Sequence, residues 1–224
     1  MATLRRLALL GGVVAAVLWS LGVIVLEAGG NPADPDSAAE LAEHFRDHRT
    51  AILLAGLLHV LGTFFFVWFL AALADGWRHL DEELQWLRTA AVISGASAAA
   101  MMLALTGPQT AGATTDTELL SPDGSLALWR LSHGFFVGAE VAFAVFVAAV
   151  SLLALAGILL PRWLGWAGLL VALLLLIVPV GWIALLLFVP IWLVVVSVLA
   201  YRASGREYEG DRHVSDVPRP LAEP

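Results

Sequence analysis

Residues 163–201 read WLGWAGLLVALLLLIVPVGWIALLLFVPIWLVVVSVLAY, a stretch without a charged side chain. As one continuous helix it would be about 58 Å long at 1.5 Å per residue, nearly twice the roughly 30 Å hydrocarbon core of a bilayer. Pro179-Val180-Gly181 lies near its middle, where proline removes a helix hydrogen bond and glycine permits a reversal. The stretch therefore predicts two antiparallel membrane helices, at 163–178 and 182–201. Because the first is short, a re-entrant hairpin is the alternative.

The rest of the chain has the same apolar character. Of its 224 residues, 60% are hydrophobic and 14% are charged, whereas a soluble domain is about half apolar and a quarter charged. Apolar segments at 7–26, 51–74, 89–106 and 128–158 reach or approach the ~20 residues that a membrane helix needs. We therefore predict an all-α integral membrane bundle of about six transmembrane helices within residues 1–202. The polar segment 203–224, which contains several prolines, is expected to be a disordered cytoplasmic tail.

The arginines predict the orientation of the bundle. With the N-terminus inside, the cytoplasmic segments hold Arg5, Arg6, Arg78, Arg88, Arg162, Arg202, Arg206, Arg212 and Arg219. The opposite side holds Arg46, Arg49 and Arg130. This distribution follows the positive-inside rule and places both termini in the cytoplasm. The apolar run at 7–26 exceeds the roughly 7–15 residues of a signal peptide, so we expect it to stay as the first span.

Missing residue types exclude several function classes. The sequence has no cysteine, which excludes disulfides, thiolate metal sites and iron–sulfur clusters, and no lysine, which excludes Schiff-base chemistry. Its net charge of −7 argues against a nucleic-acid partner. The lipid bilayer is the expected partner, and the Arg-only, Ala- and Leu-rich composition, typical of high-GC bacterial genomes, predicts a bacterial cytoplasmic membrane. No cofactor is predicted.

One acidic residue lies inside a predicted span. In SHGFFVGAEVAFAVFV, residues 132–147, Glu140 is surrounded by small, aromatic and aliphatic residues. A charged carboxylate at that depth costs several kcal/mol unless it is paired, so Glu140 is expected to face the bundle interior or to be protonated. His133 is seven residues earlier, on the same helix face and about 10.5 Å away along the axis. Arg130 continues this face towards the outer surface.

Other predicted spans place polar residues at a similar depth. At 1.5 Å per residue, His59, Ser94, Ser97 and Glu140 fall within a layer roughly 12–18 Å deep. We therefore predict that these side chains share one depth, with His133 above them. Whether they converge depends on which way the helix faces point, and the sequence leaves this open. The sequence contains no glycine-rich phosphate loop and no nucleophile elbow, and it indicates no reaction.

Three functions fit this polar layer. A buried carboxyl group near a histidine is typical of proton or small-ligand handling. Alternatively, Glu140 holds helices together in a structural or partner-binding subunit, with a protein partner or a second copy of the chain. The third alternative is a metal- or haem-binding enzyme that uses His59, His133 and Glu140 as ligands.

The two predicted outer segments carry turn and cap signals. Ser37-Ala38-Ala39-Glu40 is a capping box that predicts a helix start. His44 and His48 then have the i, i+4 spacing of two metalloprotease ligands, but Phe45 stands where that motif has its glutamate base. A solvated helix face is the preferred interpretation, and metal binding is the alternative. The second segment, 107–125, is rich in Thr and Gly and predicts a loop.

The segment Leu160-Pro161-Arg162-Trp163-Leu164-Gly165-Trp166 resembles an LPRWLGW segment of small multi-pass membrane proteins of actinobacteria, a domain family of unknown function. The likeness extends loosely over residues 128–202. The resemblance implies a six-helix inner-membrane protein and assigns no site residue.

Overall fold

The computed structural model describes residues 2–29, 37–116 and 119–215, and this part of the chain is helical apart from short connections. Its helices are α1 (Ala2–Leu9), α2 (Gly11–Ala28), α3 (Ala38–Asp47), α4 (Arg49–Gly76), α5 (Glu82–Thr114), α6 (Pro122–Leu155), α7 (Arg162–Leu175), α8 (Val178–Ile183), the π-helix η1 (Ala184–Phe188) and α9 (Val189–Ser215). No strand occurs in these described ranges, so the all-α prediction is confirmed.

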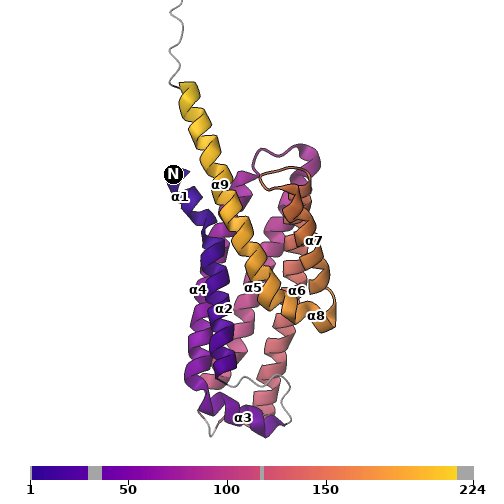
Figure 1. Ribbon diagram of the computed structural model, residues 1–224. Helices are drawn as coiled ribbons and strands as arrows, with labels where there is room; N and C mark the ends of the chain where they lie inside the picture. The colour runs from indigo at the N-terminus through magenta and orange to yellow at the C-terminus, as the bar shows by residue number, and fades with distance from the viewer. Residues whose placement is uncertain (1, 30–36, 117–118, 216–224) are drawn as a thin grey trace, which may run out of the picture.

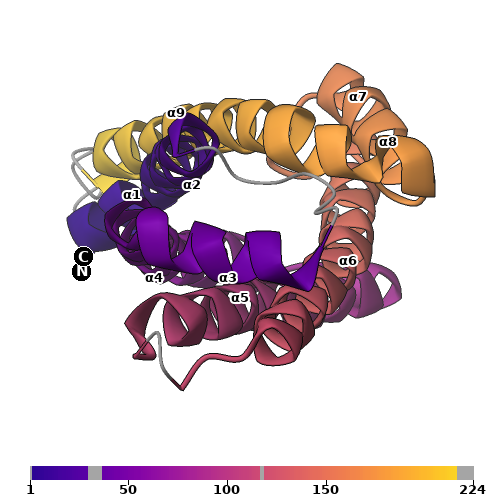
Figure 2. The same cartoon turned by 90° about the horizontal axis from the view of Figure 1, so that it is seen from below.

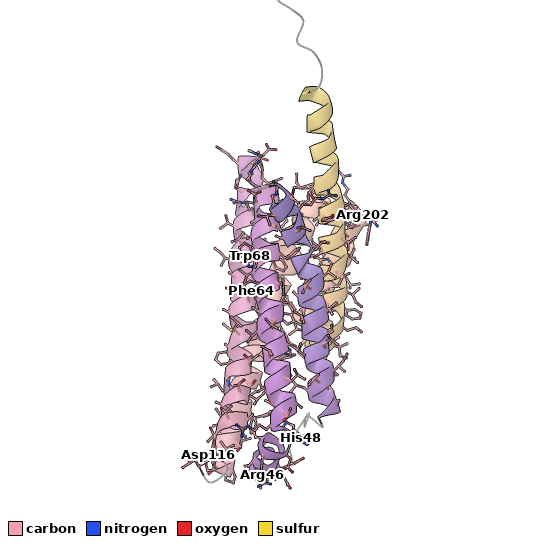
Figure 3. All side chains as sticks on the ribbon, turned by 90° about the vertical axis from the view of Figure 1, so that its left-hand side faces the viewer. Arg46, His48, Phe64, Trp68, Asp116 and Arg202 are labelled. Carbon is pink, nitrogen blue, oxygen red and sulfur yellow. The ribbon has the colours of Figure 1, made fainter. Side chains whose placement is uncertain are left out.

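The long helices form a membrane-spanning bundle. Within the described ranges, five segments are long and apolar enough to cross a membrane: Thr3–Ala28, Arg49–Gly76, Glu82–Thr114, Pro122–Leu155 and Pro179–Gly205. Figure 1 shows α2, α4, α5 and α6 running along one another, with α3 lying across their lower end. Phe64 and Trp68 point outward from α4 and are more than half exposed (Figure 3), as expected where lipid surrounds the helices.

The segment after α6 is shorter than a full span. α7 has 14 residues, which is about 21 Å of helix against a hydrocarbon core of roughly 30 Å. The chain then turns through α8 and η1, and Figure 1 shows this turn lying part-way along α6. The bundle therefore has five long helices and one shorter one. Of the two alternatives for residues 163–201, this length favours the re-entrant hairpin.

Two prolines explain the form of the hairpin. Ile177 leaves the helical conformation, with φ −93° and ψ 98°, just before the first turn of α8, which contains Pro179. Pro179 has no N–H to donate to the Leu175 carbonyl, and its ring would clash with that carbonyl in a continuous helix, so α7 cannot continue through it. η1 directly precedes the helix that contains Pro190, and such π turns are known to interrupt α-helices at functional sites.

An aromatic cluster joins three of the long helices. The ring of Trp19 on α2 lies 5.3 Å from that of Phe66 on α4 and 5.7 Å from that of Phe143 on α6. Gly62 allows the close approach of α2 and α4, because a Cβ atom there would lie 2.6 Å from Trp19 Cδ1. The cluster fixes how α2, α4 and α6 face one another.

Three helix ends differ from the predicted segment bounds. The third span was predicted to end at residue 106, but α5 continues through Pro108 to Thr114, because a helix at a bundle end tolerates a proline when neighbouring groups satisfy the freed carbonyl. α6 begins at Pro122, where Ser121 Oγ accepts a hydrogen bond from the Gly124 N–H at 3.1 Å. The tail predicted to be disordered from 203 is helical to Ser215, since no proline interrupts it, and residues 216–224 lie outside the described residues.

Both ends of the described chain lie at the same end of the bundle, opposite α3 (Figure 1). Arg5 Nε lies 2.9 Å from Asp75 Oδ2 at the end of α4, and the Arg6 guanidinium lies 4.4 Å from the centre of the Tyr201 ring on α9. These contacts tie α1 to α4 and to α9. The arrangement agrees with the predicted topology, and which end faces the cytoplasm stays a prediction.

Candidate intramembrane acidic site

Glu140 is a buried acidic side chain on α6, with 7% of its surface exposed. It lies 15 residues before the end of α6 at Leu155, which is about 22 Å along the helix axis. This distance nearly equals the length of α7. Figure 2, seen from the α3 end, shows α6 between α5 and the α7–α8 hairpin. The acidic side chain and the hairpin turn therefore lie at the same depth.

The carboxyl group of Glu140 packs against Gly181 in α8. A Cβ atom at Gly181 would lie 3.0 Å from Glu140 Oε1 and 2.9 Å from the carbonyl oxygen of Leu175, the last residue of α7. The two oxygens therefore border the same small space beside the Gly181 Cα. In a continuous helix the Leu175 carbonyl would accept the N–H of residue 179, but that residue is proline. The Leu175 carbonyl oxygen therefore lacks the N–H donor that a continuous helix would provide, and the Glu140 carboxyl group borders the same space.

Within the described part of the chain, Glu140 makes no ion pair and no hydrogen bond with a protein donor. The expectation that this side chain faces the bundle interior agrees with its burial. No arginine side chain forms an ion pair with it in the same ranges. The neutral carboxylic acid, which can donate to a carbonyl oxygen, fits these surroundings better than the carboxylate.

His59 is buried in a different contact, between α4 and α2. Its Nδ1–H donates to the Ala55 carbonyl oxygen at 2.7 Å, and its ring lies where a Cβ atom on Gly22 would be 2.5 Å from Cε1. Trp19 Nε1 donates to the His59 carbonyl oxygen at 3.3 Å. Trp19 also touches Phe143, one helical turn from Glu140. His59 and Glu140 therefore lie in separate contacts, with no hydrogen bond or ion pair between them.

Ser97, a candidate at the predicted depth, does not join Glu140. Its side chain is exposed and donates to the Ile93 carbonyl oxygen of its own helix at 2.9 Å. Ser94 is buried and likewise donates to its own helix, to the Ala90 carbonyl oxygen at 2.6 Å. The buried face of α5 runs through Ala91, Gly95 and Ala98, so Ser97 turns away from it. Neither hydroxyl is bonded to Glu140.

His133 and Arg130 are exposed, although they share a helix face with Glu140. The His133 ring stacks on Phe136 of its own helix, with ring centres 6.2 Å apart. The length of the hairpin explains the difference. Gly181 of α8 packs against Glu140, whereas His133 lies 22 residues before the end of α6, about 33 Å along the axis and beyond the roughly 21 Å of α7. His133 was predicted to lie above a buried polar layer. In the structure it lies on an exposed face of α6, on the α3 side of Glu140.

Two groups at the site were not anticipated, namely Gly181 and the Leu175 carbonyl. The Pro179-Val180-Gly181 signal predicted the turn, but sequence alone did not show that the turn meets Glu140. Two lengths could have indicated this contact. The 15 residues from Glu140 to the end of α6 and the 14 residues of α7 both measure depth from the same end of the bundle, and they are nearly equal.

The outer histidines form a pair without further ligands. The rings of His44 and His48 lie 5.0 Å apart, and the described residues contain no group of three or more His, Asp or Glu side chains arranged to hold a metal ion. Burial lowers the pKa of His44 below its usual value, the positive charge of His48 lowers it further, and Glu40 acts in the opposite direction. Metal binding by this pair has no support in the geometry.

Comparison of the chain with models of known protein families, with curated proteins and with solved structures finds no match. The resemblance of the LPRWLGW segment therefore stays a prediction.

Proposed function

We propose that this multi-pass membrane protein binds and releases a proton at Glu140, and that it does so in a bacterial cytoplasmic membrane with α3 on the outer side. The observation that carries the proposal is that Glu140 Oε1 and the Leu175 carbonyl oxygen lie 3.0 and 2.9 Å from the position of a Cβ atom on Gly181, at the turn that follows the 14-residue helix α7. Ionisable groups inside membrane helices are by default functional candidates, and broken helices supply backbone carbonyls to such sites.

The two protonation states would use the site differently. When protonated, Glu140 donates its O–H to the Leu175 carbonyl across the space that Gly181 leaves open. When charged, the carboxylate loses that bond and requires water for its stabilisation. The polar residues His133 and Arg130, on the same face of α6, lie on the α3 side of it. Proton exchange is therefore expected with the α3 side of the membrane rather than with the end that holds both termini.

Infrared spectroscopy of the purified protein in lipid tests the proposal. The wild-type protein should show the carbonyl band of a protonated carboxylic acid, which Glu140→Gln removes. Glu43→Gln provides the matched control, because Glu43 is an exposed glutamate on α3 and its replacement should leave the band in place. In liposomes that contain the protein, the band should respond to pH on the α3 side. A wild-type spectrum without any band that depends on Glu140, at acid or neutral pH, contradicts the proposal.

A further inference from the structure

A second polar site lies at the α3 end of the bundle, between α3, the start of α4 and the end of α5. A cavity of about 260 Å³ opens there. The apolar part of its lining, called the Phe45 floor below, is formed by Ala42, Phe45, Ala113 and Leu120. Gly112 lets the Phe45 ring lie against α5, because a Cβ atom there would be 2.8 Å from Phe45 Cδ1. Since ligand pockets usually hold about 300–1,000 Å³, this cavity suits a small solute or a headgroup.

The rim of the cavity carries one unpaired charge of each sign. Arg49, the first residue of α4, and Asp116, just beyond α5, both line it. They do not form an ion pair with each other, and neither has an ionic partner among the residues that the structure describes. Figure 3 shows Asp116 at the same end of the molecule as Arg46 and His48.

The other arginine at the rim is already engaged. Arg46 Nε lies 3.2 Å from Asp47 Oδ1, and its Nη2 lies 3.8 Å from Glu43 Oε1. These two carboxylates offset the charge of Arg46. The charges still available to a ligand are therefore the guanidinium of Arg49 and the carboxylate of Asp116, which line the same cavity.

We infer that this cavity binds a small zwitterion that carries an anionic group for Arg49, an ammonium group for Asp116 and an apolar portion for the Phe45 floor. A guanidinium recognises a carboxylate or a phosphate with charge-assisted hydrogen bonds, and a carboxylate accepts from an ammonium group in the same way. Two sources supply this chemistry at an outer membrane surface: a free neutral amino acid, or the headgroup of a zwitterionic phospholipid. The site is independent of Glu140.

Leucine is the probe for the free solute. Titration calorimetry on the purified protein should detect leucine binding, and Arg49→Gln and Asp116→Asn should each weaken it about tenfold or more, the equivalent of one lost charge-assisted contact. Two single-charge analogues, 4-methylpentanoate and 3-methylbutylamine, should bind more weakly than leucine by a similar factor. Arg162→Gln is the matched control, since it removes an exposed arginine at the far end of the bundle and should leave binding unchanged.

Nanodiscs of defined composition provide the lipid arm. If a headgroup occupies the cavity, phosphatidylethanolamine should raise the melting temperature relative to phosphatidylglycerol, and both variants should lose that difference while Arg162→Gln keeps it. The inference is overturned if neither leucine nor phosphatidylethanolamine distinguishes the wild type from the two variants. It is also overturned if 4-methylpentanoate binds as tightly as leucine, because Asp116 would then have no ammonium group to recognise. Glu140→Gln should leave every one of these results unchanged.

Discussion

Replacing Gly181 by alanine is the most direct structural test of the acidic site. The added Cβ atom would lie 2.9 Å from the Leu175 carbonyl oxygen and 3.0 Å from Glu140 Oε1. The carboxyl group can move away by rotating its side chain, but the carbonyl belongs to the backbone, so the hairpin turn itself must shift. Overpacking of this kind typically costs about 1–3 kcal/mol. The entropic gain of a Gly→Ala change offsets about 0.4–1 kcal/mol, which leaves a net loss of roughly 1–2 kcal/mol.

Thermal unfolding of the detergent-solubilised protein measures this loss. For a chain of this size, each kcal/mol shifts the melting temperature by about 2–4 °C, so Gly181→Ala should melt roughly 2–8 °C below the wild type. Gly134→Ala is the matched control, because Gly134 is exposed on α6 with nothing within 4 Å of the added atom. That variant should be as stable as the wild type or slightly more so. Equal melting temperatures for the two variants would contradict the packing of the turn against Glu140.

A double variant separates the two contacts. With Glu140→Ala as background, only the Leu175 carbonyl still opposes the added methyl group, so Gly181→Ala should cost less than it does in the wild type. Coupling of about 0.5 kcal/mol or more is typical of residues in contact. Additive effects would mean that the carboxyl group does not occupy the space beside Gly181.

Three further predictions follow from other parts of the bundle. Gly62→Ala should destabilise the protein by about 1–3 kcal/mol in the same melting assay, since the new atom would lie 2.6 Å from Trp19 Cδ1. Burial lowers the pKa of His44 in the folded state, so the unfolded state binds more protons near pH 6.5. The free energy of unfolding should therefore fall as the pH drops through that value. His44→Gln should flatten the pH dependence of the melting temperature. The sequence has no cysteine, so single cysteines can be introduced without background: in intact cells, a membrane-impermeant maleimide should label His133→Cys, and Leu176→Cys at the end of α7 should stay unlabelled.

The sequence predicted the split of residues 163–201 well, because the length of the apolar run and Pro179 together leave few alternatives. The inward orientation of Glu140 was also predictable, since the cost of a charge in lipid depends on one residue and its depth. Ser97 shows where such reasoning fails. Residues 94–100 of α5 are Ser, Gly and Ala, so hydropathy does not show which side of the helix faces the bundle interior. Only packing against the neighbouring helices decides which serine is buried.

The length of α7 could not be deduced in the same way. Leu173 to Val178 is apolar whether the chain continues towards the outer surface or turns back, because both routes lie in lipid. The exposure of His133 follows from that length, since a full span would have covered the same face of α6. One undetermined helix end thus accounts for the largest difference between the predicted and the observed site.

The short α7 and the buried acid are best understood as a single feature. If α7 crossed the whole membrane, the Leu175 carbonyl would accept a helical N–H four residues later, and a protonated Glu140 would face closed backbone with no free acceptor. Because Pro179 ends the helix at the depth of Glu140, the same turn that removes this N–H also presents the carbonyl to the carboxyl group, and Gly181 leaves the space between them. A proton held at that point would have a bonding partner in the neutral state, and His133 and Arg130 on the same face of α6 mark the α3 side as the side with which we expect it to exchange.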